Sequence, residues 1–164
     1  LMFAGHETTS GSLGLAMHHL AKTPDQRRLI RDDPSLWPNP VEELIRFDTP
    51  LHVDPRAAKE DIEIGGVTIE TGQRVTVMLA AANRDPRRFE NPDELRLDRE
   101  DPHSISFGHG IHHCVGAALA RMQMRVGLRV FLDRFGDYTI DEEVIEWKNH
   151  AALRGPVRLP VRRG

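Results

Sequence analysis

The segment from Phe107 to Gly116 constrains this chain most, because it places the only cysteine of the sequence among glycines, directly before a long amphipathic pattern. Gly108 and Gly110 allow the backbone conformations of a tight loop, and Gly116 leaves room for a flat group beside the following helix. Cys114 stands at the start of that helix, where free amide groups and the helix dipole favour the thiolate over the thiol. This placement favours a cysteine that binds a metal.

The residues of this segment leave two other interpretations open. A buried structural cysteine at the start of a helix would look the same in sequence. A zinc site is the second alternative, because the segment also holds three histidines that can act as ligands: His109, His112 and His113. Adjacent residues converge poorly on one tetrahedral ion, however, and no second ligand pair follows at the spacing of zinc sites.

Apolar residues at helical spacing, interrupted by prolines, predict a chain made mainly of helices. One helix is expected over residues 1–22, a second from Pro24 to the break at 34–40, and a third over Val41–Phe47. The last is expected over residues 116–134, with an apolar stripe beside a basic one. The apolar stripe consists of Leu119, Met122, Val126 and Val130, and the basic stripe of Arg121, Arg125 and Arg129.

The period changes from helical to alternating between residues 62 and 69, where Gly65-Gly66 interrupts the alternation. Two glycines that accept positive φ between alternating segments predict a β-hairpin. Residues 74–79 predict another strand and residues 137–161 two or three more, whereas residues 83–102 carry few signals of either kind. The expected fold class is therefore α+β, mainly α with small antiparallel β-sheets, in one domain of 164 residues.

Charge, hydropathy and cysteine content limit the partners and the location. The 22 basic and 25 acidic residues are interspersed and leave a net charge of −3, which argues against a general affinity for nucleic acid or an anionic membrane. The longest apolar run, residues 75–82, is far shorter than the roughly 20 residues that cross a bilayer. A single cysteine favours a reducing compartment, so the expected location is cytoplasmic. The uncapped apolar opening at Leu1 predicts a fragment whose first helix begins upstream.

Two further motifs carry charged or hydroxyl groups inside helical patterns. Glu43 and Arg46 share a helix face, which on its own is typical of a solvated surface pair. In Ala4-Gly5-His6-Glu7-Thr8-Thr9, a carboxylate and two hydroxyls follow a glycine. A threonine that bonds the carbonyl four residues earlier can loosen a helix and admit water. That motif predicts either a proton relay or a poorly formed start of a helix.

In this order and at these separations, the three motifs resemble those of the cytochrome P450 family, the haem-thiolate monooxygenases. Phe107-Gly108-x-Gly110-x-x-x-Cys114-x-Gly116 is similar to the family's haem-binding loop. Glu43-x-x-Arg46, with Arg99, resembles its ion network, and Ala4-Gly5-x-Glu7-Thr8-Thr9 resembles its distal helix. The similarity extends along the whole chain and is greatest to soluble bacterial members. It implies that residues 1–164 form the carboxy-terminal portion of a single cytochrome P450 domain, from the second half of the distal helix to the C-terminus.

The resemblance also implies roles for individual residues around a haem b cofactor. Cys114 is expected to bind the iron as thiolate, and Glu7 and Thr8 to act in catalysis by moving protons during oxygen activation. Further haem contacts are expected from Phe107, Gly108 and Gly116 in the loop and from Arg56 and His112 at the propionates. A structural role, that of holding the loop, is expected for Glu43, Arg46 and Arg99.

The implied reaction is the insertion of one oxygen atom of O2 into a small organic substrate, with electrons from NAD(P)H through a ferredoxin-type donor and its reductase. Residues 51–54 and 149–153 are expected to line the substrate pocket. The basic stripe is expected either to dock the electron donor or to face solvent, with Arg121 as its internal member. Two other functions fit the same motifs, a haem-binding sensor and an inactive truncated paralogue. Surface positions without a role are expected for His18, His19, His103 and His150.

Overall fold

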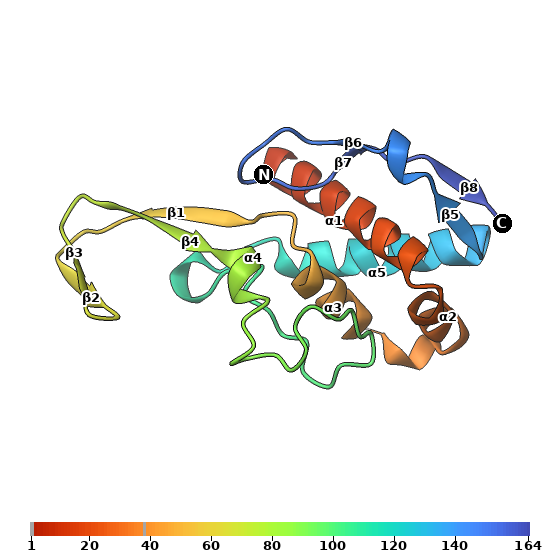
Figure 1. Ribbon diagram of the computed structural model, residues 1–164, viewed down its shortest axis with the longest axis horizontal. Coiled ribbons are helices and arrows are strands. Elements are labelled where there is room, and N and C mark those ends of the chain that lie inside the picture. The colour runs from red at the N-terminus through yellow and green to blue at the C-terminus, as the bar shows by residue number, and fades with distance from the viewer. Residues whose placement is uncertain (1, 38) are drawn as a thin grey trace.

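The computed structural model describes residues 2–37 and 39–164, which form a helical body with a narrow projecting β-arm (Figure 1). Leu1, in the first predicted helix, and Pro38, in the predicted break, lie outside the described residues. The helices are α1 (Met2–Lys22), α2 (Pro24–Asp32), α3 (Asn39–Phe47), α4 (Leu79–Ala82) and α5 (Ala117–Phe135). Short 3₁₀ helices accompany them as η1 (Pro34–Leu36), η2 (Gly110–His112) and η3 (Glu142–Val144).

The strands pair two by two in antiparallel ladders. In the arm, β1 (Val53–Ala57) pairs with β4 (Arg74–Met78), and β2 (Ile62–Ile64) pairs with β3 (Val67–Ile69) at the tip. Towards the C-terminus, β5 (Tyr138–Ile140) pairs with β8 (Val161–Arg163), and β6 (Glu146–Trp147) with β7 (Pro156–Arg158). The expected fold class, mainly α with small antiparallel sheets, is confirmed.

The hairpin between β2 and β3 forms where the sequence predicts it. Gly65 and Gly66 make its turn with φ angles of 61° and 80°. Residues with a Cβ rarely adopt two positive φ angles in succession, so the two glycines fix the register that pairs Ile62 with Ile69.

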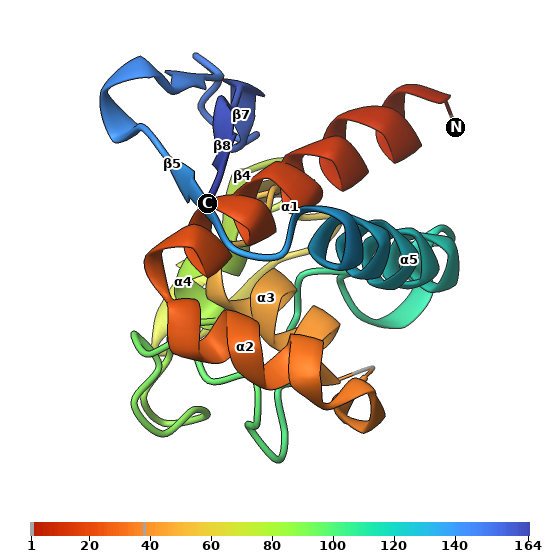
Figure 2. The same cartoon turned by 90° about the vertical axis from the view of Figure 1, so that its right-hand side faces the viewer.

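Helix α1 organises the body, because it packs against α5, α2 and α3 and also contacts β5 and β7 (Figure 2). A close approach between α1 and α5 depends on Gly127, where an added Cβ would lie 3.1 Å from Cδ2 of Leu13. The buried core joins residues of every helix in this group. It includes Ala16, Leu20, Ile30, Val41, Leu44, Ile45, Leu97, Met124, Leu128, Leu132 and Tyr138.

The buried face of α5 is not the apolar stripe that the sequence suggests. Ala117, Met124, Leu128 and Leu132 are the buried residues of this helix. The stripe of Leu119, Met122, Val126 and Val130 is instead exposed to between 49 and 57%. Two apolar stripes therefore run along α5. Helices α1 and α3 pack against the stripe that contains Met124, Leu128 and Leu132.

Other differences from the sequence prediction lie at element boundaries. Strand β1 is not predicted, because Pro55 interrupts its alternation and denies the ladder an amide donor. Leu79, predicted as the end of a strand, begins the short helix α4. Residues 83–102 contain neither helix nor strand, as predicted. Among the described residues, no helix combines the length and the apolar character needed to cross a bilayer.

Candidate functional site

Cys114 lies in the loop between η2 and α5, and backbone hydrogen bonds within this segment close the loop. The amide of Cys114 donates to the carbonyl of Phe107 at 2.8 Å, and the amide of Gly108 donates to that of Ile105 at 2.8 Å. Gly108 and Gly110 adopt φ angles of 71° and 66°, the left-handed conformation that favours glycine. The sequence therefore predicts the shape of this loop correctly.

The thiol of Cys114 is exposed, so the interpretation as a buried structural cysteine is wrong. Ile111 and Val115 beside it are 97% and 88% exposed, which gives the loop an uncovered apolar surface. In the described ranges, no three His, Cys, Asp or Glu side chains are placed to hold a metal ion together, so the loop histidines and Cys114 do not form a zinc site. One exposed sulfur on an apolar surface fits a haem, which takes a single protein ligand and covers a broad apolar face.

Phe107 and Arg121 fix the two ends of the loop to each other. The guanidinium carbon of Arg121 lies 4.4 Å from the centroid of the Phe107 ring, and Arg121 also pairs with Glu42 of α3. Arg121 is thus the internal member of the basic stripe, as predicted, whereas Arg125 and Arg129 are exposed. The contact holds Phe107 beside the segment that carries Cys114.

A second anchor for the loop comes from Asn83, which the sequence does not single out. Its side chain is fully buried. It donates to Oγ of Ser106 at 2.8 Å and accepts from the amide of Ile105 at 3.0 Å. Ser106 in turn donates to the carbonyl of Ile45 on α3 at 3.1 Å. Asn83 therefore connects α3 and α4 to the residues that enter the cysteine loop.

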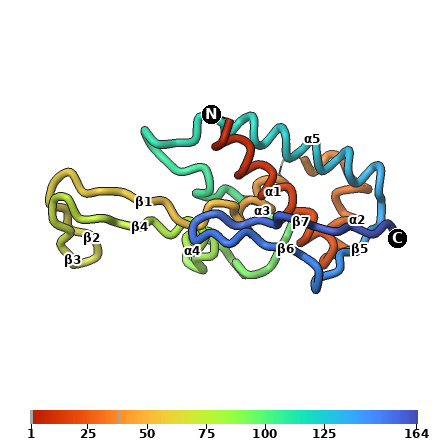
Figure 3. Tube along the Cα trace, turned by 90° about the horizontal axis from the view of Figure 1, so that it is seen from above, coloured from red at the N-terminus to blue at the C-terminus, as the bar shows by residue number. Residues whose placement is uncertain are grey.

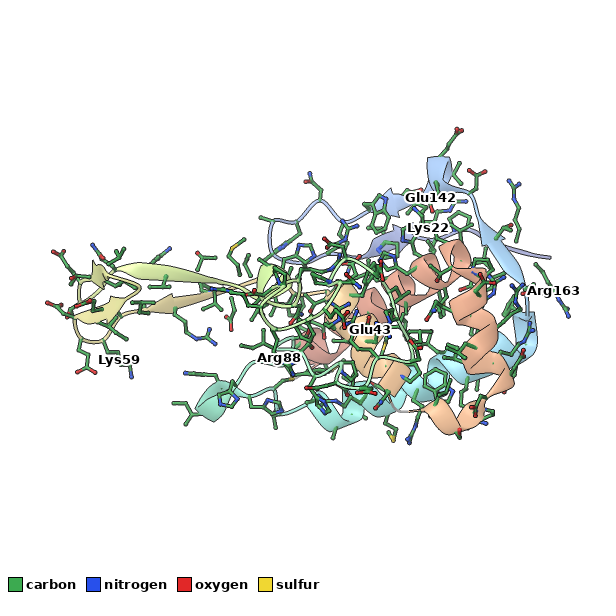
Figure 4. All side chains as sticks on the ribbon, turned by 60° about the horizontal axis from the view of Figure 1, so that its bottom comes forward. Lys22, Glu43, Lys59, Arg88, Glu142 and Arg163 are labelled. Atoms are coloured by element: carbon green, nitrogen blue, oxygen red, sulfur yellow. The ribbon has the colours of Figure 1, made fainter. Side chains whose placement is uncertain are left out.

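Glu43 and Arg46 are buried, with exposed fractions of 0 and 1%, so the interpretation as a solvated surface pair is wrong. Figure 4 shows Glu43 inside the body. Its carboxylate accepts from Nε and Nη2 of Arg46 at 2.6 and 2.9 Å, and from Nε of Arg99 at 3.0 Å. The amide of Arg96 donates to the same carboxylate at 3.0 Å. The network ties α3 to the irregular segment of residues 83–102.

Glu7 and Thr8 lie on the first turns of α1, which stays helical through both. The hydroxyl of Thr8 donates to the carbonyl of Ala4 at 2.7 Å, the bond to the fourth preceding residue that the sequence suggests. The carboxylate of Glu7 pairs with Nζ of Lys148, a residue without any signal in the sequence. The hydrogen bond and the charge of Lys148 hold the pKa of Glu7 below its ordinary value.

Arg56 and His112, the expected propionate ligands, lie on separate elements. Arg56 is on β1, where its Nη1 pairs with Oδ1 of Asp54 at 2.6 Å, and this hydrogen bond raises the pKa of Arg56. His112 is exposed on η2. In the part of the chain that the structure describes, no hydrogen bond or ion pair links Arg56, His112 or Cys114 to Glu7 or Thr8.

The two segments expected to line a substrate pocket lie side by side. Leu51 and Leu153 form an antiparallel bridge, and the amide of His52 donates to the carbonyl of Ala152 at 2.8 Å. His150 orders this turn, because its Nδ1 accepts from the amides of Ala152 and Leu153. His150 is exposed, as expected of a surface residue, and its contacts are confined to its own turn.

His18 and His19, in contrast, are not the surface residues that the sequence suggests. Nε2 of His18, which is buried, lies 2.9 Å from Oε1 of Glu142, and Nε2 of His19 lies 2.8 Å from Oδ2 of Asp48. Figure 4 labels Glu142 beside Lys22, to which it is paired at 3.6 Å. Both carboxylates come from distant segments, so the sequence around the histidines holds no signal of the contacts. His103 is exposed and paired with Asp101, as a surface residue would be.

Comparisons with known proteins show which family the chain resembles. The family model for cytochrome P450 matches residues 1–158. The chain is 41% identical over 167 residues to cytochrome P450 107B1 of Saccharopolyspora erythraea, covering 100% of this chain and 41% of that protein. It is 42% identical to cytochrome P450 130 of Mycobacterium tuberculosis, covering 99% of this chain and 40% of that protein.

Solved structures show the same likeness. The P450 monooxygenase TamI bound to tirandamycin C superposes with a TM-score of 0.93 at 42% identity, covering 99% of this chain and 41% of that one. CYP109E1 of Bacillus megaterium in complex with testosterone superposes with a TM-score of 0.95 at 27% identity, covering 100% of this chain and 46% of that one. The chain spans about two fifths of the length of the curated relatives it matches. It belongs to the cytochrome P450 family.

Proposed function

We propose that this chain carries the cysteine-ligand side of a haem-thiolate monooxygenase. The reaction is the insertion of one oxygen atom of O2 into a small organic substrate, with electrons from NAD(P)H through a ferredoxin-type donor and its reductase. The observation that carries the proposal is the exposed thiol of Cys114 on a loop closed by its own backbone, in a member of the cytochrome P450 family. We propose further that residues 1–164 are the carboxy-terminal portion of one catalytic domain, which accords with the matched share of the relatives.

The residues of the loop would hold haem b. Cys114 would bind the iron as thiolate, and Gly116 lies close to it, because a Cβ added there would be in ordinary van der Waals contact with Sγ at 3.8 Å. Phe107 and Gly108 would shape the loop that holds the group, and Arg56 and His112 would pair with its propionates. When bound, the haem supplies a redox-active iron at which O2 is reduced.

Glu7 and Thr8 would bind water and move protons during oxygen activation. Glu7 would take up a proton from bulk solvent and pass it on through water towards Thr8, which returns its carboxylate to the ionised form that Lys148 favours. The Thr8 hydroxyl would donate its hydrogen bond onward once it leaves the carbonyl of Ala4. A proton supplied at the right place and time favours product over released peroxide, because general acid–base groups act through position as well as pKa.

The class of substrate is proposed from the relatives and from the chemistry of the lining segments. TamI binds tirandamycin C and CYP109E1 binds testosterone, both organic molecules. The paired segments 51–54 and 149–153 place Leu51 and Leu153 next to each other beside polar groups of His52 and Asp54. We propose a small organic substrate with polar substituents. The electron donor would meet exposed Arg125 and Arg129, and the single unpaired cysteine suits the cytoplasm.

The proton-relay part of this proposal is tested in the haem-loaded protein supplied with O2 and electrons. Thr8→Ala is expected to keep oxygen consumption while a larger fraction of the oxygen is released as hydrogen peroxide. Thr23→Ala is the matched control, because Thr23 makes the same bond to its fourth preceding carbonyl at the far end of α1, at 2.9 Å. An unchanged peroxide fraction in Thr8→Ala contradicts the assignment.

A further inference from the structure

We propose that Lys148 is a positioning residue for the proton relay, which holds the Glu7 carboxylate in place. The inference rests on the proposed function and names a residue that neither the motifs nor the resemblance points to. Nζ of Lys148 contacts Oε2 of Glu7 and lies 3.4 Å from the backbone carbonyl of the same residue. A cation that contacts both the side chain and the backbone of Glu7 restricts the rotation of its carboxylate.

Backbone contacts of the β6–β7 turn hold Lys148 beside Glu7. Its amide donates to the carbonyl of Gly155 at 3.0 Å, which closes the turn between β6 and β7. An added Cβ on Gly155 would lie 2.9 Å from the Cα of Gly11 on α1. Because neither glycine has a side chain, the backbone of the turn packs directly against the backbone of α1. Figure 3 shows the C-terminal segment passing over α1. The turn is thereby held against the helix that carries Glu7.

Burial strengthens the contact. The Lys148 side chain is 18% exposed and that of Glu7 34% exposed, so the pair is more shielded from water than the exposed pair of Glu146 on β6 and Arg158 on β7. The charged groups that face Glu7 are Lys148 from the turn and His6 from α1 itself. The lysine dominates, and both groups lower the pKa of the carboxyl.

The position of Lys148 in the chain connects the relay to the proposed substrate pocket. Lys148 directly precedes the turn of residues 149–153, which is hydrogen-bonded to His52 and bridged to Leu51. One short segment therefore carries the cation that holds Glu7 and the residues proposed to meet substrate. A movement of the turn would change the environment of the Glu7 carboxylate.

The first test is a direct titration of the Glu7 carboxyl carbon by NMR in the ¹³C-glutamate-labelled protein. We expect Lys148→Met to raise the pKa of Glu7 towards that of an ordinary glutamate, and Lys148→Arg to retain the lowered value. Arg158→Met is the matched control, because it removes a cation from the same strand pair without touching Glu7. An unchanged Glu7 pKa in Lys148→Met overturns the inference.

The second test follows the peroxide fraction of the haem-loaded protein as a function of pH. Because Lys148 keeps Glu7 ionised to lower pH, Lys148→Met is expected to move the acidic rise of the peroxide fraction to higher pH, so that the two proteins differ most just below the ordinary glutamate pKa of about 4.3. Lys148→Arg is expected to keep the pH profile of the unchanged protein. If the profile of Lys148→Met matches that of the unchanged protein while Thr8→Ala raises the peroxide fraction, the positioning role fails and the relay stands. If Thr8→Ala has no effect, the relay itself fails, and the positioning role with it.

Discussion

Arg99 donates through Nε to Oε2 of Glu43 at 3.0 Å, and the two residues are 56 positions apart in the sequence. Arg46 donates to the same oxygen at 2.6 Å, so two buried guanidinium groups share one buried carboxylate as their counter-charge. The remaining donors of Arg99 reach the carbonyls of Glu90, Asn91 and Glu94. This single cluster holds a segment that has no helix or strand of its own.

Loss of the Glu43 charge is expected to destabilise the protein strongly. Glu43→Gln keeps the shape of the side chain but leaves two buried cations without a counter-charge, which costs about 3–5 kcal/mol. The measurement is the free energy of unfolding in urea. Glu146→Gln is the control, because Glu146 belongs to an exposed pair and its loss should leave the midpoint unchanged. Equal midpoints for the two variants would contradict the structural role of Glu43.

Asn83→Ala is expected to loosen the entry to the cysteine loop. The substitution leaves the amide of Ile105 and the hydroxyl of Ser106 without their buried partner, at a cost of about 1–3 kcal/mol. Hydrogen exchange of residues 105–116 should accelerate more than exchange in α2. Asn149→Ala, at an exposed asparagine, provides the comparison. Exchange that rises equally in α2 would mean that Asn83 acts on global stability alone.

Two glycines of α1 are expected to respond to alanine in opposite directions. A Cβ on Gly14 would lie 2.5 Å from Cγ of Pro156, a rigid ring, so Gly14→Ala should destabilise by about 1–3 kcal/mol. A Cβ on Gly5 meets nothing within 4 Å, so Gly5→Ala should stabilise by about 0.5–1 kcal/mol through helix propensity. Thermal unfolding of both variants separates the effects. A stabilising Gly14→Ala would disprove the close packing of β7 on α1.

Part of the loss of folding stability at low pH is expected to come from Asp48. Burial raises the pKa of this carboxyl, but the hydrogen bond from His19 and the charge of Arg154 outweigh it and leave the pKa below its ordinary value. A carboxyl whose pKa is lowered in the folded state contributes its full share to the free energy of unfolding above the ordinary aspartate pKa of about 3.9. This contribution is lost as the pH falls through the lower pKa of the folded state. Asp48→Asn should therefore show a shallower loss of unfolding free energy below about pH 4. Parallel curves for the two proteins would exclude Asp48 as a contributor.

Local patterns in the sequence predict much of this fold. Proline positions and helical spacing define α1, α2 and α5, and paired glycines define the β2–β3 turn, because these signals act within a few residues. The glycine loop around Cys114 is predicted for the same reason. Strand β1 is missed because its only partner, β4, lies across an intervening hairpin and Pro55 obscures its pattern.

Contacts between distant residues account for what the sequence cannot predict. The local pattern around Glu43 suggests a surface residue, and only the resemblance to the family points to its network with Arg99. The sequence around His18 holds no signal at all of its contact with Glu142. Lys148 lies 141 positions from Glu7 and carries no motif of its own. Side chains of this kind gain their roles from packing, which a single sequence does not encode in any local spacing.

The central claim is that Cys114 provides a thiolate ligand to haem, and the ferrous carbon monoxide difference spectrum tests it most directly. The spectrum is measured on the purified protein and on Cys114→Ser, with iron and zinc quantified in the same samples. We predict iron without zinc and a strongly red-shifted Soret band that disappears in Cys114→Ser. A haem spectrum without that shift, or a red-shifted band that survives in Cys114→Ser, would contradict the claim.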